Sequence, residues 1–140
     1  MRVRLYATVR IDNIDAVRVQ LREAVQAAID ETAEEIADEA SEGVRVDTGA
    51  LQASFYVVTP TTTDYPEAAA AALARRPSAR LLRPAPIPAP GVAFVGSAVE
   101  HWIYNEFGTT RMSPNPTLTR ATEAARPRLR DRLRRAIGAR

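Results

Sequence analysis

An Asp-Thr-Gly-Ala tetrad at residues 47–50 is the first place in this sequence where residue types and spacing could support chemistry. In aspartic proteases, an aspartate on such a turn shares one proton with a second aspartate and acts as acid and base. A second Asp47 would have to come from another copy of the chain, and the apolar-apolar-Gly segment that such enzymes also need would be residues 94–96. The alternative is a turn in which the Asp47 carboxylate accepts bonds from backbone N–H groups.

The surrounding sequence favours the turn. Residues 14–43 have helical periodicity, whereas retroviral-type proteases are almost wholly β, and six glycines are too few for a glycine-rich flap. The chain has no cysteine, which excludes a thiol nucleophile and a thiolate zinc site, and its single histidine, His101, has no second ligand at metal spacing. We therefore expect no catalytic residue, no metal and no cofactor. His101 is interpreted as a surface or capping residue, and Trp102 as a half-buried core residue.

The elements that would position these residues follow from periodicity. Alternation over residues 2–11 predicts a strand with one wet face. Steps of three and four from Ile14 to Ala40 predict a helix, with Asp12 or Asn13 as its cap and Gly43 ending it in a left-handed conformation. Residues 53–59 and 92–96 are β-prone and predict neighbouring strands. The expected fold is α+β: a small, mostly antiparallel sheet packed against a long N-terminal helix and a C-terminal helix.

Residues 62–90 form a Pro/Ala-rich insert in this single domain of residues 1–140. Pro66 predicts the first position of a short helix, and the prolines from residue 77 onward predict an extended stretch that is either a surface loop or a partner-binding arm. Residues 98–107 predict a short helix. Asn115 and Pro116 are expected to open the last helix, with Leu118 on its apolar stripe, and Pro127 is expected to divide that helix into two pieces.

Charge is divided unevenly along the chain, with six arginines against eleven acids in residues 1–50 and thirteen arginines against six acids in residues 51–140. This asymmetry predicts that the acidic face of the first helix, residues 31–42, meets the arginines of the last helix within one chain, or those of the last helix or the insert on a neighbouring subunit. An alternative is that the arginine-rich last helix binds nucleic acid without sequence preference, although no aromatic residue interleaves its arginines. The subunit-interface hypothesis involves Glu31, Glu35, Asp38, Glu39, Arg128, Arg132 and Arg135.

Three segments, in order, resemble the neck or tail-component proteins of long-tailed bacteriophages of the HK-ninety-seven gene-ten type. They are VDTGALQAS at 46–54, YNEFGTTRM at 104–112 and NPTLTRA at 115–121. The third departs from the family pattern, because Thr117 stands where phenylalanine is usual and Arg120 where proline is usual. The residues that carry the resemblance are Asp47, Thr48, Gly49, Leu51, Glu106, Phe107, Gly108, Thr109, Pro116 and Leu118.

The resemblance implies a non-enzymatic structural protein of the virion, assembled in the host cytoplasm into the neck or tail. Its subunits are expected to form a ring, of six copies or alternatively twelve, that joins head to tail or completes the tail. Expected partners are neighbouring connector and tail proteins, and DNA that passes through the lumen without specific binding; no membrane contact is expected. Within the second motif, Phe107 is interpreted as a core anchor, Gly108 as a helix cap, and Glu106 as an acceptor for N–H groups around Thr48 and Gly49.

Overall fold

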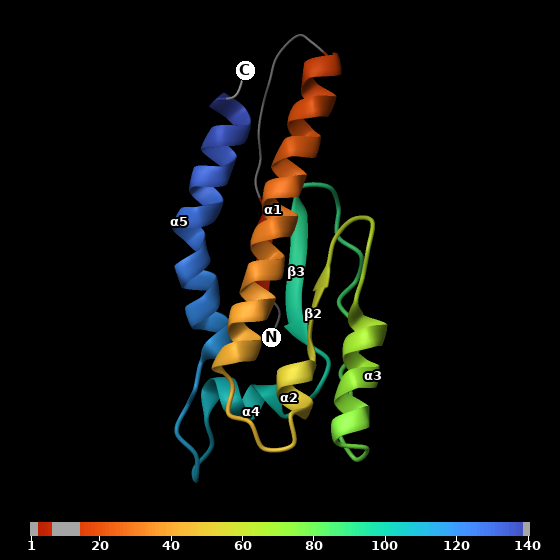
Figure 1. The fold of residues 1–140 in the computed structure, drawn as a ribbon, viewed down its shortest axis with the longest axis vertical. Coiled ribbons are helices and arrows are strands. Elements are labelled where there is room, and N and C mark those ends of the chain that lie inside the picture. Colours follow the sequence, from red (N-terminus) through yellow and green to blue (C-terminus); the bar gives the residue numbers. More distant parts are fainter. Residues whose placement is uncertain (1–2, 7–14, 139–140) are drawn as a thin grey trace.

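The computed structural model describes the backbone of residues 3–6 and 15–138 and the side chains of residues 17–138 (Figure 1). Its elements confirm the expected α+β class, with one short strand before a long N-terminal helix and two more between that helix and a long C-terminal helix. In chain order they are β1 (Val3–Tyr6), α1 (Asp15–Gly43), α2 (Ala50–Ala53), β2 (Phe55–Val58), α3 (Tyr65–Arg75), β3 (Val92–Ser97), α4 (Trp102–Phe107) and α5 (Thr117–Gly138).

The sheet has three antiparallel strands in the order β1-β3-β2. Pairing of β2 with β3, with Val57 opposite Val95, confirms that the two predicted β-prone segments are neighbours. The predicted first strand is confirmed over Val3–Tyr6, which pairs with β3. The remainder of that prediction, and the caps proposed at Asp12 and Asn13, lie outside the described residues.

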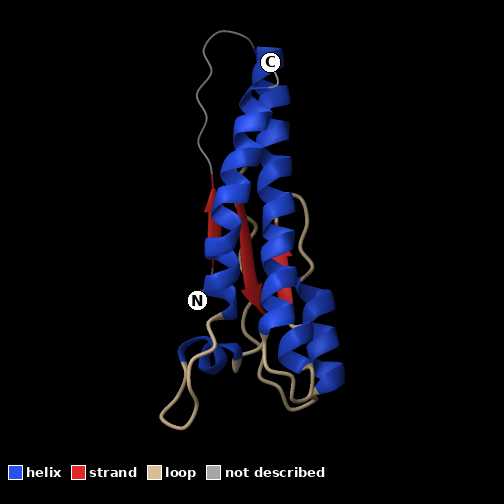
Figure 2. Cartoon of the chain, turned by 60° about the vertical axis from the view of Figure 1, so that its left-hand side comes forward, coloured by secondary structure: helices blue, strands red, loops and turns tan. Residues whose placement is uncertain are grey.

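Helix α1 covers one face of the sheet and α5 packs along the outer side of α1, so these elements form three layers (Figures 1 and 2). The predicted apolar seam of α1 is buried, with Ile29 and Ile36 fully enclosed beside Val57 and Val95 of the sheet. Alanines at positions 33 and 40 are also fully buried, which lets the backbones of neighbouring elements approach closely. Most of the core therefore lies between α1 and its two neighbouring layers.

Helix α3 and the proline-rich insert cover the opposite face of the sheet. Tyr56, Phe94 and Ala85 belong to a second buried cluster there, and the Tyr56 hydroxyl accepts a 3.0 Å hydrogen bond from the Ala85 amide. Three residues before Ala85, the Leu82 amide donates a 2.8 Å hydrogen bond to the Ala98 carbonyl. The insert is therefore packed as part of the fold, although the Ile87 side chain remains 69% exposed.

A tight turn lies along the outer edge of β2. The Asp64 carboxylate accepts a 2.5 Å bond from the Val57 amide, and the Asp64 amide donates back to the Val57 carbonyl at 3.3 Å. Val58 also forms an isolated antiparallel bridge with Thr63. The backbone amide and carbonyl of Val57, which face away from β3, are thus already paired by the chain's own turn.

Two predictions about helix ends and breaks are wrong. Helix α5 continues through Pro127 as one element, because that residue lies on the exposed side, where the unbonded carbonyl can reach water. Gly43 is the last residue of α1 but has no positive φ; its carbonyl accepts a 3.1 Å bond from the Asn115 side-chain amide, which satisfies the helix end without a left-handed residue. None of the described helices is both long and apolar enough to cross a bilayer.

Candidate functional site

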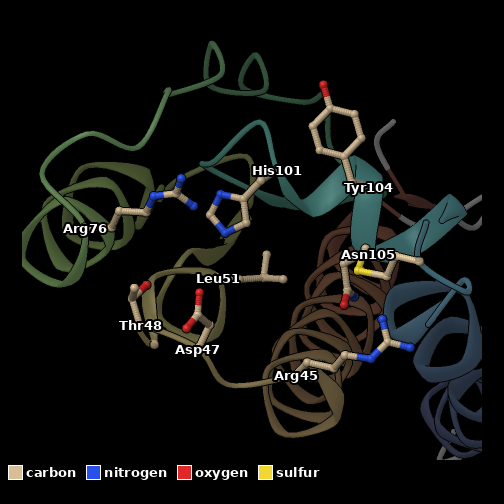
Figure 3. Close-up of a pocket in the computed structure, with 10 residues that line it drawn as sticks. Arg45, Asp47, Thr48, Leu51, Arg76, His101, Tyr104 and Asn105 are labelled. Atoms are coloured by element: carbon tan, nitrogen blue, oxygen red, sulfur yellow. The ribbon is translucent and has the colours of Figure 1, made fainter. Parts of the chain in front are cut away.

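The segments 46–51 and 104–109 meet at one end of the molecule, around a pocket of about 300 Å³ (Figure 3). The first segment connects α1 to α2, and the second covers most of α4 and the residues after it. The pocket is lined by Arg45, Asp47, Thr48, Gly49, Leu51, Arg76, His101, Tyr104, Asn105 and Met112. Two motifs more than fifty residues apart in sequence thus build the same site.

The first motif is a turn, as predicted, but its hydrogen bonding differs from the prediction. Gly49 has a φ of 82°, and a Cβ at this position would lie 2.7 Å from a guanidinium nitrogen of Arg75. The positive φ makes glycine the preferred residue at this position, whereas the Arg75 guanidinium, at the end of a flexible side chain, could move aside. The Thr48 hydroxyl, not the Asp47 carboxylate, accepts the bond from the Ala50 amide, at 3.2 Å. Leu51 is buried in the main core and anchors the turn.

Asp47 is exposed and lies in the pocket with His101 and Arg76 (Figure 3). Burial lowers the pKa of His101 below its ordinary value, and the charge of Arg76 lowers it further, while Asp47 partly opposes this. The imidazole is therefore neutral at pH 7, and the pocket carries two guanidinium groups, of Arg45 and Arg76, against one carboxylate. Asp47 follows a long helix rather than a strand, unlike the catalytic aspartate of a retroviral-type protease.

Glu106 is the most constrained charged residue of the second motif, with only 2% of its surface exposed. Its carboxylate accepts bonds from the backbone amides of Leu118, at 3.2 Å, and Thr119, at 2.8 Å, and from the Thr119 hydroxyl at 2.7 Å. The expectation that Glu106 binds free N–H groups is confirmed, but these belong to the first turn of α5 and not to Thr48 and Gly49. A negative charge at this position also interacts favourably with the helix dipole.

Phe107 is 55% exposed, so the interpretation of this residue as a core anchor is wrong. In the short helix α4, Trp102 and Glu106 take the buried side and leave Phe107 facing outward. Gly108 ends α4 with a φ of 75°, as a cap glycine should, and a Cβ there would lie 2.8 Å from the Met112 carbonyl oxygen. Thr109 closes the following turn through a 2.8 Å bond from its amide to the same carbonyl.

Asn115 connects three helices instead of capping α5 with its side chain. Its backbone amide donates to the Asn105 carbonyl at 2.7 Å, and its side chain donates to the end of α1, as described above. Arg45 adds a further link, because its guanidinium donates to the Ser113 carbonyl at 3.2 and 3.3 Å. Helix α5 begins at Thr117, one residue after the predicted Pro116, and Leu118 is buried as predicted.

His101 and Trp102 occupy the start of α4. His101 stands at the N-cap position without a side-chain bond to the helix. Trp102 is 1% exposed, and so is more deeply buried than the half-buried position expected for it. Its indole nitrogen has no hydrogen-bond partner among the described residues, which makes Trp102 a packing residue of the junction.

The acidic side of α1 and the arginines of α5 meet within one chain. Arg128 contacts Glu35 and Glu39 at 3.2 and 2.6 Å, and Arg132 contacts Glu35 and, at 3.4 Å, Glu31. These salt bridges correspond to the intramolecular option, and they need no neighbouring subunit. Over the residues that the structure describes, Asp38 and Arg135 take part in no salt bridge.

Sequence patterns gave no indication of Arg76 and Asn105 as pocket residues. Arg76 follows α3 and reaches the site only because α3 packs beside α2. Asn105 lies inside a predicted helix and has no distinctive spacing to the first motif. Proximity in space, rather than any local pattern, brings these two residues to the pocket.

A comparison with protein-family models identifies the family of this chain. Residues 10–81 match the model described as "Bacteriophage HK97-gp10, putative tail-component". The chain belongs to the HK97-gp10-like family. The matched residues of this HK97-gp10-like chain include the turn at 46–51 and end before the second motif. The family is described as that of a phage tail component. Comparisons with curated proteins and with solved structures gave no match.

Proposed function

We propose that this HK97-gp10-like chain is a structural subunit of a long-tailed phage virion that forms a ring in the neck and joins head to tail or completes the tail. The proposal rests on the structural role of the motif residues, which hold the ends of several helices together. Gly49, Glu106 and Gly108 fix a turn, a helix start and a helix end, and so join α1, α4 and α5 at one rigid junction. Residues used in this way position surfaces for assembly and catalyse no reaction.

The end of the molecule that carries the junction also exposes large apolar side chains. Val46, Tyr104 and Phe107 are 65%, 50% and 55% exposed, and Tyr104 lines the pocket. Exposed apolar residues grouped beside a pocket mark protein–protein contact sites more often than scattered single residues do. This end therefore suits contact with a neighbouring connector or tail protein, while the DNA passes through the ring without specific recognition.

Native mass spectrometry tests the proposal, on the purified chain alone and on the chain mixed with the neighbouring connector and tail proteins of its phage. We expect a closed oligomer, of six copies or alternatively twelve, in at least one of the two samples. A Phe107→Asp variant should keep the ring and lose the neighbouring protein, whereas Ile87→Asp, a change of similar exposure on the insert, should lose neither. A monomer in both wild-type samples would reject the proposal.

Nucleic-acid binding by α5 is the alternative function. The structure removes Arg128 and Arg132 from the arginines available to phosphate, because both are paired with glutamates of α1. Exposed arginines nevertheless remain on the outer side of α5. Retention of duplex DNA by the isolated protein at about 0.15 M salt would favour this alternative.

A further inference from the structure

Two charged surfaces remain after the salt bridges between α1 and α5 are accounted for. The arginine face consists of Arg126, Arg130 and Arg134, which are exposed on α5 and form no salt bridge in the described part of the chain. The acidic face consists of Asp30, Glu34 and Asp38 on α1. Neither face contributes to the core, and both therefore remain available to a partner.

The acidic face carries mutually repelling carboxylates. The pKa of Glu34 is raised, first by burial and then by the charges of Asp64, Asp38 and Asp30. Among the described residues, no arginine is paired with these four carboxylates. A cationic surface placed against them would relieve the repulsion and restore an ordinary pKa to Glu34.

The two faces have the same spacing. Residues four apart along an α-helix lie about 6 Å apart on one side of it, and both triplets follow this spacing twice, over about 12 Å. Three arginines on one helix can therefore lie opposite three carboxylates on another, in register. Glu123 and Asp131 are the acidic residues of α5 near the arginine face, and the additional arginines at positions 120 and 135 offset them.

The two faces also lie at the same height, on different sides of the α1–α5 pair. Arg128 contacts Glu35 and Glu39, and Arg132 contacts Glu35, which places Arg130 level with Glu35 and hence with Glu34 beside it. Glu35 and Glu39 contact α5, whereas Glu34, one residue before Glu35, lies a further 100° around α1, outside that contact and near the Asp64 turn. A contact between faces at equal height can relate two copies by rotation with no rise, which produces a closed ring when the rotation angle divides a full turn.

We propose that the arginine face of one copy binds the acidic face of the next copy around the ring. This inference rests on the proposed ring function and names the surfaces that make it. Each exposed ion pair strengthens association by roughly two- to fivefold, and reversing a charge replaces attraction with repulsion. Reversing two charges on one face should therefore weaken association by roughly 100-fold or more, and the wild-type contact should weaken as salt increases.

The test uses two charge-reversed proteins in the sample in which the wild type forms its ring. Arg130→Glu with Arg134→Glu makes both faces acidic, and Glu34→Arg with Asp38→Arg makes both faces basic. Each variant alone should be monomeric by native mass spectrometry, and an equimolar mixture of the two should restore a ring of alternating copies. Far-ultraviolet circular dichroism checks that each variant is folded.

The matched control for the Arg130/Arg134 variant is Arg83→Glu with Arg111→Glu, which makes the same change in net charge at exposed positions outside both faces. This control should assemble like the wild type. If the wild type forms a ring and either reversed variant still does so alone, the pairing is wrong while the ring function stands. If the Arg130/Arg134 variant keeps the ring but loses retention of duplex DNA, the arginine face binds nucleic acid and the pairing is likewise wrong.

Discussion

Replacing Glu106 with alanine should be among the most destabilising changes outside the apolar core. The substitution removes the acceptor for two backbone amides and one hydroxyl at the start of α5, in a place that is 98% shielded from water. Loss of a helix cap costs about 0.5–2 kcal/mol, and each buried donor left unsatisfied costs about 1–3 kcal/mol. Partial relaxation of the helix start keeps the sum below the maximum, so we expect a loss of about 3 kcal/mol in the free energy of unfolding.

Urea denaturation followed by the fluorescence of Trp102 measures this loss directly, because Trp102 is the only tryptophan and is buried beside the junction. A loss of about 3 kcal/mol corresponds to a decrease of about 10 °C in the melting temperature of a chain of this length. Glu106→Gln keeps one acceptor oxygen and should cost about half as much. Glu100→Ala is the control, because Glu100 pairs only with Arg80, at 3.9 Å, and Arg80 is 85% exposed. If Glu106→Ala costs no more than Glu100→Ala, the carboxylate does not hold the helix start and our account of the second motif is wrong.

Three further changes test other parts of the structure. Gly49→Ala should reduce the free energy of unfolding by about 1–2 kcal/mol because of its φ of 82°, whereas Gly138→Ala, with open space around it, should stay within about 0.5 kcal/mol of the wild type in the same urea experiment. Burial lowers the pKa of His101, so the unfolded chain takes up a proton on this residue first, and the free energy of unfolding should decrease as pH falls below about 6.5. The His101→Gln variant should show a smaller decrease in the free energy of unfolding between about pH 7.5 and 5.5. A pH profile identical to that of the wild type would contradict this prediction. Hydrogen bonding to Arg132 lowers the pKa of Glu35, so this pair should stabilise the fold above about pH 4.5 and lose its effect in more acidic solution. A double-mutant cycle with Glu35→Gln and Arg132→Gln should give a coupling energy of about 1 kcal/mol at pH 7. A coupling energy near zero would contradict the pairing.

Periodicity predicted the long elements because their burial pattern repeats over many turns. The buried residues of α1 from Leu21 to Ala40 follow steps of three and four, so the interpretation does not depend on any single residue. Helix α4 spans only six residues, less than two turns. At that length the buried side of the helix is poorly determined by the sequence, and tertiary packing decides that Phe107 faces outward.

Long-range partners could not be inferred from local patterns. Glu106 was recognised as a residue that accepts N–H bonds, but its partners, twelve and thirteen residues further on, depend on where the loop after α4 returns the chain. Charge patterning likewise indicated that the two long helices attract one another. It cannot tell a contact within one chain from a contact between two, because that depends on the distance between α1 and α5, which the arrangement of Arg128 and Glu35 now supplies.

The turn that bonds to the outer edge of β2 also limits how these molecules can associate. Sheets grow into fibrils when the outermost strand offers free amide and carbonyl groups to an incoming chain. Here the carboxylate and amide of Asp64 already bond the amide and carbonyl of Val57, so these groups offer no template to an incoming strand. An association of two copies at this position would therefore use side-chain contacts, which are easily corrected, instead of backbone pairing, which is slow to undo.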